Sequence, residues 1–283
     1  MITIGDNIMK KIKNSLIVLL CMMLLASVIG CGSSNQATET PTPTPKNQPP
    51  VTLTISVAAS LKDSMDDIKK KYVKENPNVT ININYGSSGM LEQQIEQGAN
   101  VDIFMSAATK QMDALTQKDL LLEDTKVNLL GNKVVLIAKK DSKLKMKDIK
   151  DLSAIDKSQK LALGEPKTVP AGQYAEEILT KLNVFDKVKP KVVYAKDVKE
   201  VLTWVETGNA DAGVVYLTDA KVSKKVKVVA TAPDNLLSSP IVYPVAVTKA
   251  SKNVAVAEDF VKYLSDTEAK EVFEKYGFDY LKK

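Results

Sequence analysis

The sequence predicts an α/β protein with two lobes, and three observations support this. Strand-like and helix-like segments alternate from Thr52 almost to the C-terminus, a pattern typical of parallel sheets flanked by helices. The chain has 283 residues, enough for two domains. Two strands near the start of the alternating region also run directly into serines that begin a helix.

The first two strand–helix units follow the same design. Strands are predicted at 52–57 and 79–85, because apolar and polar residues alternate there with a period of two. The first leads into Ala58-Ala59-Ser60-Leu61 and the second into Gly86-Ser87-Ser88-Gly89. Apolar residues then recur at helical spacing, so both serine segments are expected to open helices.

The remaining elements follow in order. Strands are predicted at 101–105, 133–139, 161–163, 192–194, 211–216, 226–230 and 243–247. Helices are predicted after Ser106, from 169–172, after Asp197, briefly from Thr218, and at 253–264 and 266–276. We expect Ser265 and Glu268 to cap the last helix and Gly277 to end it. The chain is expected to leave the first lobe near Gly131 and to return near Ser239-Pro240.

The N-terminal segment has the pattern of a signal peptide. Lysines precede an apolar run from Leu16 to Ile29, which is short for a membrane span of ~20 residues. The ending Val28-Ile29-Gly30-Cys31 resembles a bacterial lipobox, which implies lipid modification of Cys31. We predict a lipoprotein signal peptide over 1–30 and a disordered tether over 31–50, which is rich in polar residues and Thr-Pro. A plain signal peptide or a membrane anchor is the alternative, and either Met1 or Met9 can be the start.

The composition excludes several kinds of site. There is no histidine, and the two cysteines, Cys21 and Cys31, both lie in or at the end of the signal segment. The mature chain therefore has no disulfide, no cysteine or histidine metal site and no histidine base. Every basic residue is lysine, so no guanidinium can bind an anion. The net charge of +5 is modest and the lysines are scattered, which argues against nucleic acid as a partner.

Nothing in the sequence predicts an enzyme. The carboxylate pairs Asp66-Asp67 and Glu176-Glu177 occupy adjacent helical positions and so face apart. Lys196 beside Asp197 is interpreted as a surface lysine next to a helix cap. No nucleotide-binding or nucleophile motif is present.

Four strand-to-helix junctions offer a different chemistry. Ser60, Ser88, Ala171 and Val198 lie at or beside these junctions, where unpaired N–H groups and the positive end of the helix dipole attract anions. Taken singly, each serine could instead be an ordinary N-cap. Taken together, in an exported α/β chain, they favour a cradle for a small anion.

The order and spacing of several motifs carry a resemblance to a known family. The motifs are 57–61, 85–89, 129–132, 164–166, 169–172, 196–198, 213–216, 243–246 and 273–278, which begin with Val-Ala-Ala-Ser-Leu and end with Phe-Glu-Lys-Tyr-Gly-Phe. From about residue 51 to its end, the chain resembles the molybdate-binding solute receptors of ABC importers.

The resemblance implies a two-lobed periplasmic-binding-protein fold, each lobe a mostly parallel sheet flanked by helices, with two crossover strands at the hinge. Lobe 1 would comprise 51–131 and 240–283, and lobe 2 would comprise 132–239. Carried over by motif, the oxyanion ligands are Ser60, Ser88, Ala171, Val198 and the hydroxyl of Tyr216. Gly89 stands where some relatives have another serine, which makes Ser87 a candidate extra donor.

The resemblance further implies a receptor without a cofactor and without catalytic residues, whose only metal is the molybdenum of its ligand. Its ligand would be molybdate, with tungstate also bound, and its partners an ABC permease and, through the lipid on Cys31, the outer face of the cytoplasmic membrane. It would act as a monomer. Molybdate is an unprotonated dianion and suits a site of donors only, whereas phosphate carries a proton and needs an acceptor. Sulfate remains an alternative ligand, an enzyme on the same scaffold is a weaker alternative, and an adhesion or structural protein is disfavoured.

Overall fold

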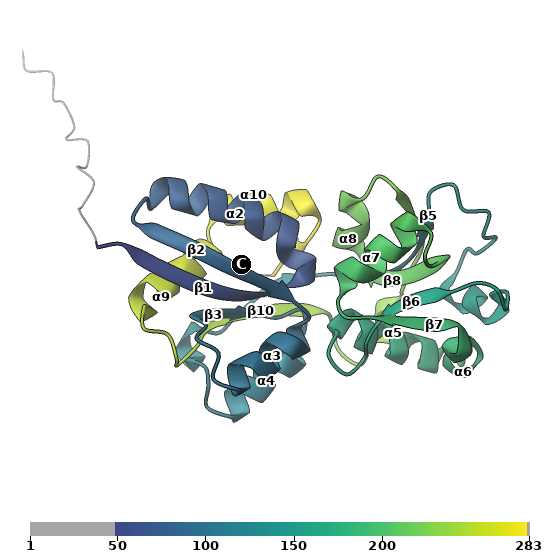
Figure 1. Ribbon diagram of the computed structural model, residues 1–283, viewed down its shortest axis with the longest axis horizontal. Coiled ribbons are helices and arrows are strands. Elements are labelled where there is room, and N and C mark those ends of the chain that lie inside the picture. Colours follow the sequence, from purple (N-terminus) through teal and green to yellow (C-terminus); the bar gives the residue numbers. More distant parts are fainter. Residues whose placement is uncertain (1–48, 282–283) are drawn as a thin grey trace, which may run out of the picture. The chain divides into compact units, whose positions relative to one another are not determined.

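The computed structural model describes residues 49–281 and contains two sheets, each with helices on its faces (Figure 1). The first sheet has the strand order β11-β4-β10-β3-β1-β2. Its strands are β1 (Val51–Ala58), β2 (Val79–Gly86), β3 (Ile103–Met105), β4 (Val127–Gly131), β10 (Val242–Val247) and β11 (Asp279–Tyr280). The alternating apolar residues of β1, Leu53, Ile55 and Val57, are fully buried, as the period of two predicts for a strand packed on a helix layer.

The second sheet has the strand order β7-β6-β8-β5-β9. Its strands are β5 (Val134–Lys139), β6 (Leu161–Gly164), β7 (Val192–Ala195), β8 (Ala212–Tyr216) and β9 (Val226–Thr231). Strand β8 is buried along its whole length and pairs with β5 and β6. We call the elements around the first sheet lobe 1 and those around the second sheet lobe 2.

The expected two-lobed α/β architecture is confirmed, but the sheets are mixed more evenly than expected. Parallel pairing joins β1 with β2 and β3, and β6 with β7 and β8. The strands next to the inter-lobe connections, β4, β5, β9 and β10, pair antiparallel with their neighbours. The chain passes from β4 of the first sheet into β5 of the second, and it returns from β9 to β10. No α-helix lies in either connection, in contrast to the helical connections that join neighbouring parallel strands.

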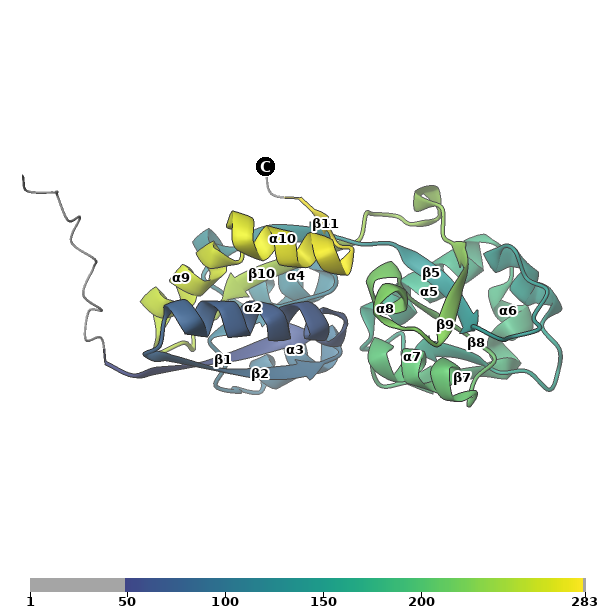
Figure 2. The same cartoon turned by 90° about the horizontal axis from the view of Figure 1, so that it is seen from above.

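Helices cover both faces of the first sheet. They are α2 (Lys62–Glu75), α3 (Ser88–Glu96), α4 (Thr109–Gln117), α9 (Val254–Tyr263) and α10 (Thr267–Tyr276). Helices α2 and α10 lie side by side on one face, and α3 and α4 lie together on the other (Figures 1 and 2). Apolar residues at helical spacing on α2, namely Met65, Ile68 and Tyr72, are buried against the sheet.

The second sheet is covered by α5 (Pro170–Lys181), α6 (Phe185–Val188), α7 (Val198–Thr207) and α8 (Leu217–Val222). Short 3₁₀ turns occur at η1 (Ala59–Leu61), η2 (Glu123–Thr125), η3 (Ile149–Ala154), η4 (Lys189–Lys191) and η5 (Asp234–Leu236). The short elements β4, β11 and α6 were not among the predicted ones, because two to five residues carry little periodicity.

The predicted cap of the last helix was wrong at its start and right at its end. Asp266, not Ser265, is the N-cap of α10, and the Ser265 hydroxyl instead donates to the carbonyl oxygen of Val261, 3.3 Å away. The preceding helix α9 takes this hydroxyl because its last turn has carbonyl groups without helical partners. Gly277 ends α10 with a left-handed φ of 91°, which glycine adopts without strain.

The predictions for the signal peptide, for Cys31 and for the tether as far as residue 48 concern residues that lie outside the described range of 49–281. Within that range, no helix combines the length and the apolar character needed to span a bilayer.

Candidate functional site

All five residues predicted to bind the anion line one small cavity. The cavity is also lined by Ala58, Ala59, Gly86, Ser87, Ala107, Val169, Pro170 and Asp197, besides Ser60, Ser88, Ala171, Val198 and Tyr216. These residues come from both lobes, at the points where β1, β2, β6, β7 and β8 end. The cavity measures about 10 Å³, which is close to the smallest space that holds one water.

A larger hollow of about 780 Å³ lies elsewhere, beside residues 142–147 and 208–211 of lobe 2. It contains none of the predicted site residues. Among residues 49–281, no group of three or more histidine, cysteine, aspartate or glutamate side chains is placed to hold a metal ion. Convergent donors therefore single out the smaller cavity.

The two serine hydroxyls of lobe 1 do not cap their helices. Ser60 is the middle residue of η1, and Ser88 is the first residue of α3, whose N-cap is Ser87. Neither η1, α2 nor α3 has a side-chain hydrogen bond at its N-cap. The interpretation of these serines as ordinary N-caps is therefore wrong, and their hydroxyls are available for other partners.

The hydroxyl of Ser88 has a backbone N–H as its hydrogen-bond donor. Its Oγ accepts a hydrogen bond of 2.9 Å from the N–H of Ala107 and is completely buried. The hydroxyl proton is then free to point into the cavity. Ser87 is also buried, and its Oγ has no hydrogen-bond partner within residues 49–281. It can therefore serve as the extra donor that we expected because Gly89 stands where some relatives have a serine.

Lobe 2 contributes helix N-termini rather than hydroxyls. In α5 the first hydrogen bonds are made by Gly172 and Gln173, whose N–H groups donate to the oxygen of Val169. In α7 they are made by Glu200 and Val201, which donate to Asp197. The N–H groups of Ala171 and Val198 precede these bonds and lie at the positive ends of the helix dipoles. Pro170 fits the first turn of α5, where its missing N–H leaves no bond unmade.

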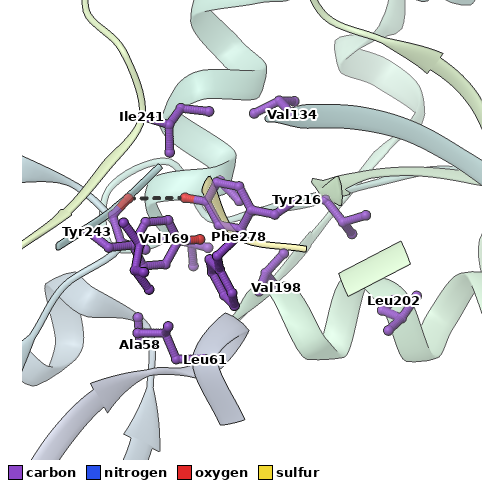
Figure 3. Packing of buried hydrophobic residues seen from close by; sticks show 14 of the residues in the cluster. Ala58, Leu61, Val134, Val169, Val198, Leu202, Tyr216, Ile241, Tyr243 and Phe278 are labelled. Atoms are coloured by element: carbon purple, nitrogen blue, oxygen red, sulfur yellow. Dashed lines mark hydrogen bonds between the residues drawn. The ribbon is translucent and has the colours of Figure 1, made fainter. Parts of the chain in front are cut away.

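Tyr216 closes the cavity from the end of β8. Its ring packs edge-on against Tyr243 with centroids 5.6 Å apart, and both rings lie with Phe278 and Val198 in Figure 3. Burial raises the pKa of Tyr216 well above its ordinary value of 10, so its hydroxyl keeps its proton and acts as a donor. That hydroxyl donates to the carbonyl oxygen of Ala107 over 3.4 Å, a long bond that is easily exchanged for a better acceptor.

Three contacts hold the lobes together beside the cavity. The N–H of Gly89 in lobe 1 donates to the carbonyl oxygen of Thr168 in lobe 2 over 2.9 Å. The Tyr216 hydroxyl donates in the opposite direction, from lobe 2 to the carbonyl oxygen of Ala107 in lobe 1. The Lys199 ammonium of α7 lies 2.7 Å from Asp63 of α2 and 3.1 Å from Asp219 of α8.

This ion group contains one ammonium and two carboxylates. Burial raises the pKa of Asp219 to about 6 even though Lys199 opposes the shift. Burial lowers the pKa of Lys199, but the carboxylates of Asp219 and Asp63 raise it by more, so the ammonium stays charged. Of the residues lining the cavity only Asp197 is acidic, and its Oδ1 accepts from the N–H of Glu200, 2.9 Å away, as the N-cap of α7.

The sequence did not assign a role to the residues behind Ser60. The Ser60 hydroxyl lies 3.0 Å from the Tyr243 hydroxyl, and Asn132 donates to Tyr243 over 3.1 Å and to Thr218 over 2.9 Å. Tyr243 and Asn132 both belong to motifs that carried the family resemblance. Neither residue lines the cavity. The motifs alone therefore gave no reason to predict a functional role for them.

Comparison with known proteins places the fold and the family. The family model for bacterial extracellular solute-binding proteins matches residues 53–279. Haemophilus influenzae molybdate-binding protein ModA is 45% identical over 80% of this chain and 89% of its own. Bacillus subtilis YvgL, which carries the provisional name of an ABC transporter substrate-binding lipoprotein, is 46% identical over 89% of this chain and 92% of its own.

Among solved structures, the periplasmic molybdate-binding protein of Azotobacter vinelandii superposes with a TM-score of 0.71 over 80% of this chain and 98% of its own. At 24% identity this likeness supports the fold alone. The match to the family model covers the whole described core, and the two relatives extend over most of both chains. The chain therefore belongs to the bacterial extracellular solute-binding protein family, among the relatives of ModA.

Proposed function

We propose that this protein captures molybdate, and also tungstate, between its lobes and delivers it to an ABC importer without catalysing a reaction. The observation that carries the proposal is the convergence of uncharged donors on one cavity. Hydroxyls of Ser60, Ser88 and Tyr216 and backbone N–H groups of Ala171 and Val198 come from both lobes. Because ModA of Haemophilus influenzae is named for molybdate binding, the same ligand is the first to test.

The donor set suits a small anion in both energy and charge. A hydrogen bond to a charged group contributes roughly 1.5–3 kcal/mol net, so five of them can offset much of the dehydration of a dianion. The ends of α5 and α7 each add roughly 0.3–2 kcal/mol through the helix dipole. An anion held from both sides also draws the lobes together, which excludes water and strengthens each bond.

The same proposal covers the location of the protein. Lipid modification of Cys31 would anchor it to the outer face of the cytoplasmic membrane, and 31–50 would tether the folded part to the lipid. The naming of YvgL as a lipoprotein supports this. We propose that lobe 1 comprises 51–131 and 240–283, that lobe 2 comprises 132–239, and that the receptor acts as a monomer.

Calorimetric titration of the purified protein with molybdate, tungstate, sulfate and hydrogen phosphate tests the ligand. We expect molybdate and tungstate to bind with one site per chain and to outcompete sulfate, whose shorter bonds leave donors out of reach. Sulfate displacing molybdate at equal concentration would assign the receptor to sulfate. Preferred binding of hydrogen phosphate would identify Asp197 as an acceptor for its proton, and no binding by any oxyanion would contradict the proposal.

A further inference from the structure

We propose that Tyr243 is a positioning residue that makes Ser60 a hydrogen-bond donor to the ligand, and that Asn132 fixes the direction of this chain. The chain runs from the Asn132 amide to the Tyr243 hydroxyl, then to the Ser60 hydroxyl and into the cavity. It would give the receptor its preference for oxyanions without a proton. The inference rests on the proposed function and assigns a cause to its selectivity.

The orientation of the Asn132 amide is fixed by its neighbours. Its Oδ1 accepts from the backbone N–H of Lys133 over 2.9 Å, and a backbone N–H can only donate. Its Nδ2 therefore faces Tyr243 and Thr218, at 3.1 and 2.9 Å. The reversed amide would place an NH₂ group against the Lys133 N–H and lose that bond, so Asn132 is a donor to Tyr243.

The donor at Asn132 determines what Tyr243 can do. The Tyr243 hydroxyl has one proton and accepts from Asn132, and its other hydroxyl neighbours are the Ser60 Oγ, 3.0 Å away, and the Tyr216 hydroxyl. Tyr243 is completely buried, and burial raises its pKa well above 10, so it remains a neutral phenol. Donation from Tyr243 to Ser60 uses the 3.0 Å contact between the two hydroxyls, whereas the opposite direction leaves only the Tyr216 hydroxyl as an acceptor for the phenol proton.

The consequence for Ser60 is a fixed polarity. With Tyr243 donating to it, the Ser60 hydroxyl has its own proton left for the cavity that Ser60 lines. Ser88 reaches the same state through the Ala107 N–H. Hydrogen bonds in such a chain polarise one another, which strengthens the last donor. A ligand with its own proton then meets two hydroxyls whose protons already point toward it, which disfavours donation by the ligand.

Tyr243→Phe tests this by removing the hydroxyl and keeping the ring and its packing. Affinities for molybdate and, by competition, for hydrogen phosphate are measured for the wild type and the variant. We expect molybdate affinity to fall about tenfold and the ratio of molybdate to phosphate affinity to fall by at least as much, because Ser60 becomes able to accept a proton. Tyr263→Phe is the matched control, since Tyr263 is a largely buried tyrosine of α9 whose hydroxyl contacts Glu268 instead.

Asn132→Asp reverses the chain rather than cutting it. The N132D carboxylate accepts from Tyr243, so Tyr243 must accept from Ser60 and the Ser60 proton is withdrawn from the cavity. Molybdate affinity is then expected to fall at least as far as in Ser60→Ala. If Tyr243→Phe fails to fold in a thermal melt, this variant alone decides the question.

Three results would contradict the proposed hydrogen-bond chain from Asn132 through Tyr243 to Ser60. They are an unchanged ratio of affinities in Tyr243→Phe, no measurable phosphate binding by that variant, and molybdate affinity in Asn132→Asp that stays above that of Ser60→Ala. If the wild type itself binds no molybdate, the proposed function fails instead, and the two failures are therefore distinguishable.

Discussion

The two lobes supply the same cavity with different kinds of donor. Lobe 1 supplies side-chain hydroxyls: Ser60 lies 3.0 Å from the Tyr243 hydroxyl, and Ser88 accepts from the N–H of Ala107. Lobe 2 supplies backbone N–H groups, at Ala171 and Val198, held by the start of a helix. Tyr216 is the one hydroxyl that lobe 2 adds.

The difference determines what sequence change can do to each side. A hydroxyl is lost by replacing one side chain, so the donors of lobe 1 depend on residue identity. A backbone N–H survives almost any replacement, so the donors of lobe 2 depend on the position of the helix. Side-chain replacements should therefore weaken binding in lobe 1 and leave it unchanged in lobe 2. This contrast tests the assignment of each donor.

The largest effect is expected from the ion group behind the donors of lobe 2. Lys199→Met leaves Asp219, which is completely buried, without its cation at 3.1 Å. Removing one partner of a buried pair destabilises a protein by roughly 3–5 kcal/mol, because the remaining charge must be protonated or stay unpaired. Urea unfolding at pH 7 measures this loss.

The double variant Lys199→Met, Asp219→Asn is its control. With both charges removed, most of the lost stability should return, since replacing a buried pair is often close to neutral. A double variant as unstable as the single one would show that Lys199 acts through packing. Either variant should weaken molybdate binding, because the contact from Lys199 to Asp63 across the lobes is lost.

The next effect separates the two kinds of donor directly. Ser60→Ala and Ser88→Ala each remove a hydrogen bond to a charged ligand worth roughly 1.5–3 kcal/mol, which is a loss of about 10- to 150-fold in affinity. Val198→Ala keeps the N–H that lobe 2 contributes, so its affinity should stay close to the wild type. Calorimetry on the three variants measures the contrast, and a large loss in Val198→Ala would contradict the backbone assignment.

A smaller effect should follow from moving a helix of lobe 2 instead of a side chain. A Cβ on Gly172 would lie 2.0 Å from the carbonyl oxygen of Gly164, so Gly172→Ala pushes the start of α5 away from β6. Such overpacking costs about 1–3 kcal/mol, and the displaced Ala171 N–H should weaken molybdate binding without any change in donor identity. Thermal melts and titration are the measurements.

Gly86→Ala is the matched control in lobe 1. Its added Cβ would meet only the side chain of Leu91, at 3.3 Å, and that side chain can adjust. Equal losses in the two glycine variants would mean that close packing at Gly172 does not position the donor.

The sequence predicted the fold well wherever its signal was local. The alternation of Leu53, Ile55 and Val57 predicted β1, and the apolar spacing of α2 predicted the face that packs on the sheet. Antiparallel pairing of β5 and β10 was not predicted, because strand direction depends on which lobe the chain enters. The two short strands β4 and β11 were missed for want of length.

The candidate site was predictable only as a set of residue types. The five donors lie at strand ends, and strand ends are visible in the sequence. The contact between Ser60 and Tyr243 could not be predicted from the sequence, because Tyr243 lies 183 residues away and contacts Ser60 only in the folded chain. The ion group of Lys199 was equally hidden, since Asp63 and Asp219 belong to different lobes.

The smallest expected effect concerns pH, and it again distinguishes lobe 2 from lobe 1. The pKa of Asp219 rises from 3.8 unfolded to about 6 in the fold, so the native state binds this proton more tightly. Its contribution to stability is therefore present below pH 3.8 and is lost as pH rises through 6. In lobe 1, the Tyr276 hydroxyl lowers the pKa of Asp67 below 3.8, and the stability that Asp67 contributes is lost only in stronger acid.

Between pH 7 and pH 5, Asp219 should therefore dominate. We expect the free energy of unfolding to rise by about 1 kcal/mol relative to the Asp219→Asn variant over this interval. Urea unfolding of both proteins at the two pH values measures the difference. A difference that does not change with pH would mean that Lys199 keeps Asp219 ionised throughout, and the ion group would then be a permanent bridge between lobe 2 and Asp63 rather than one that weakens in mild acid.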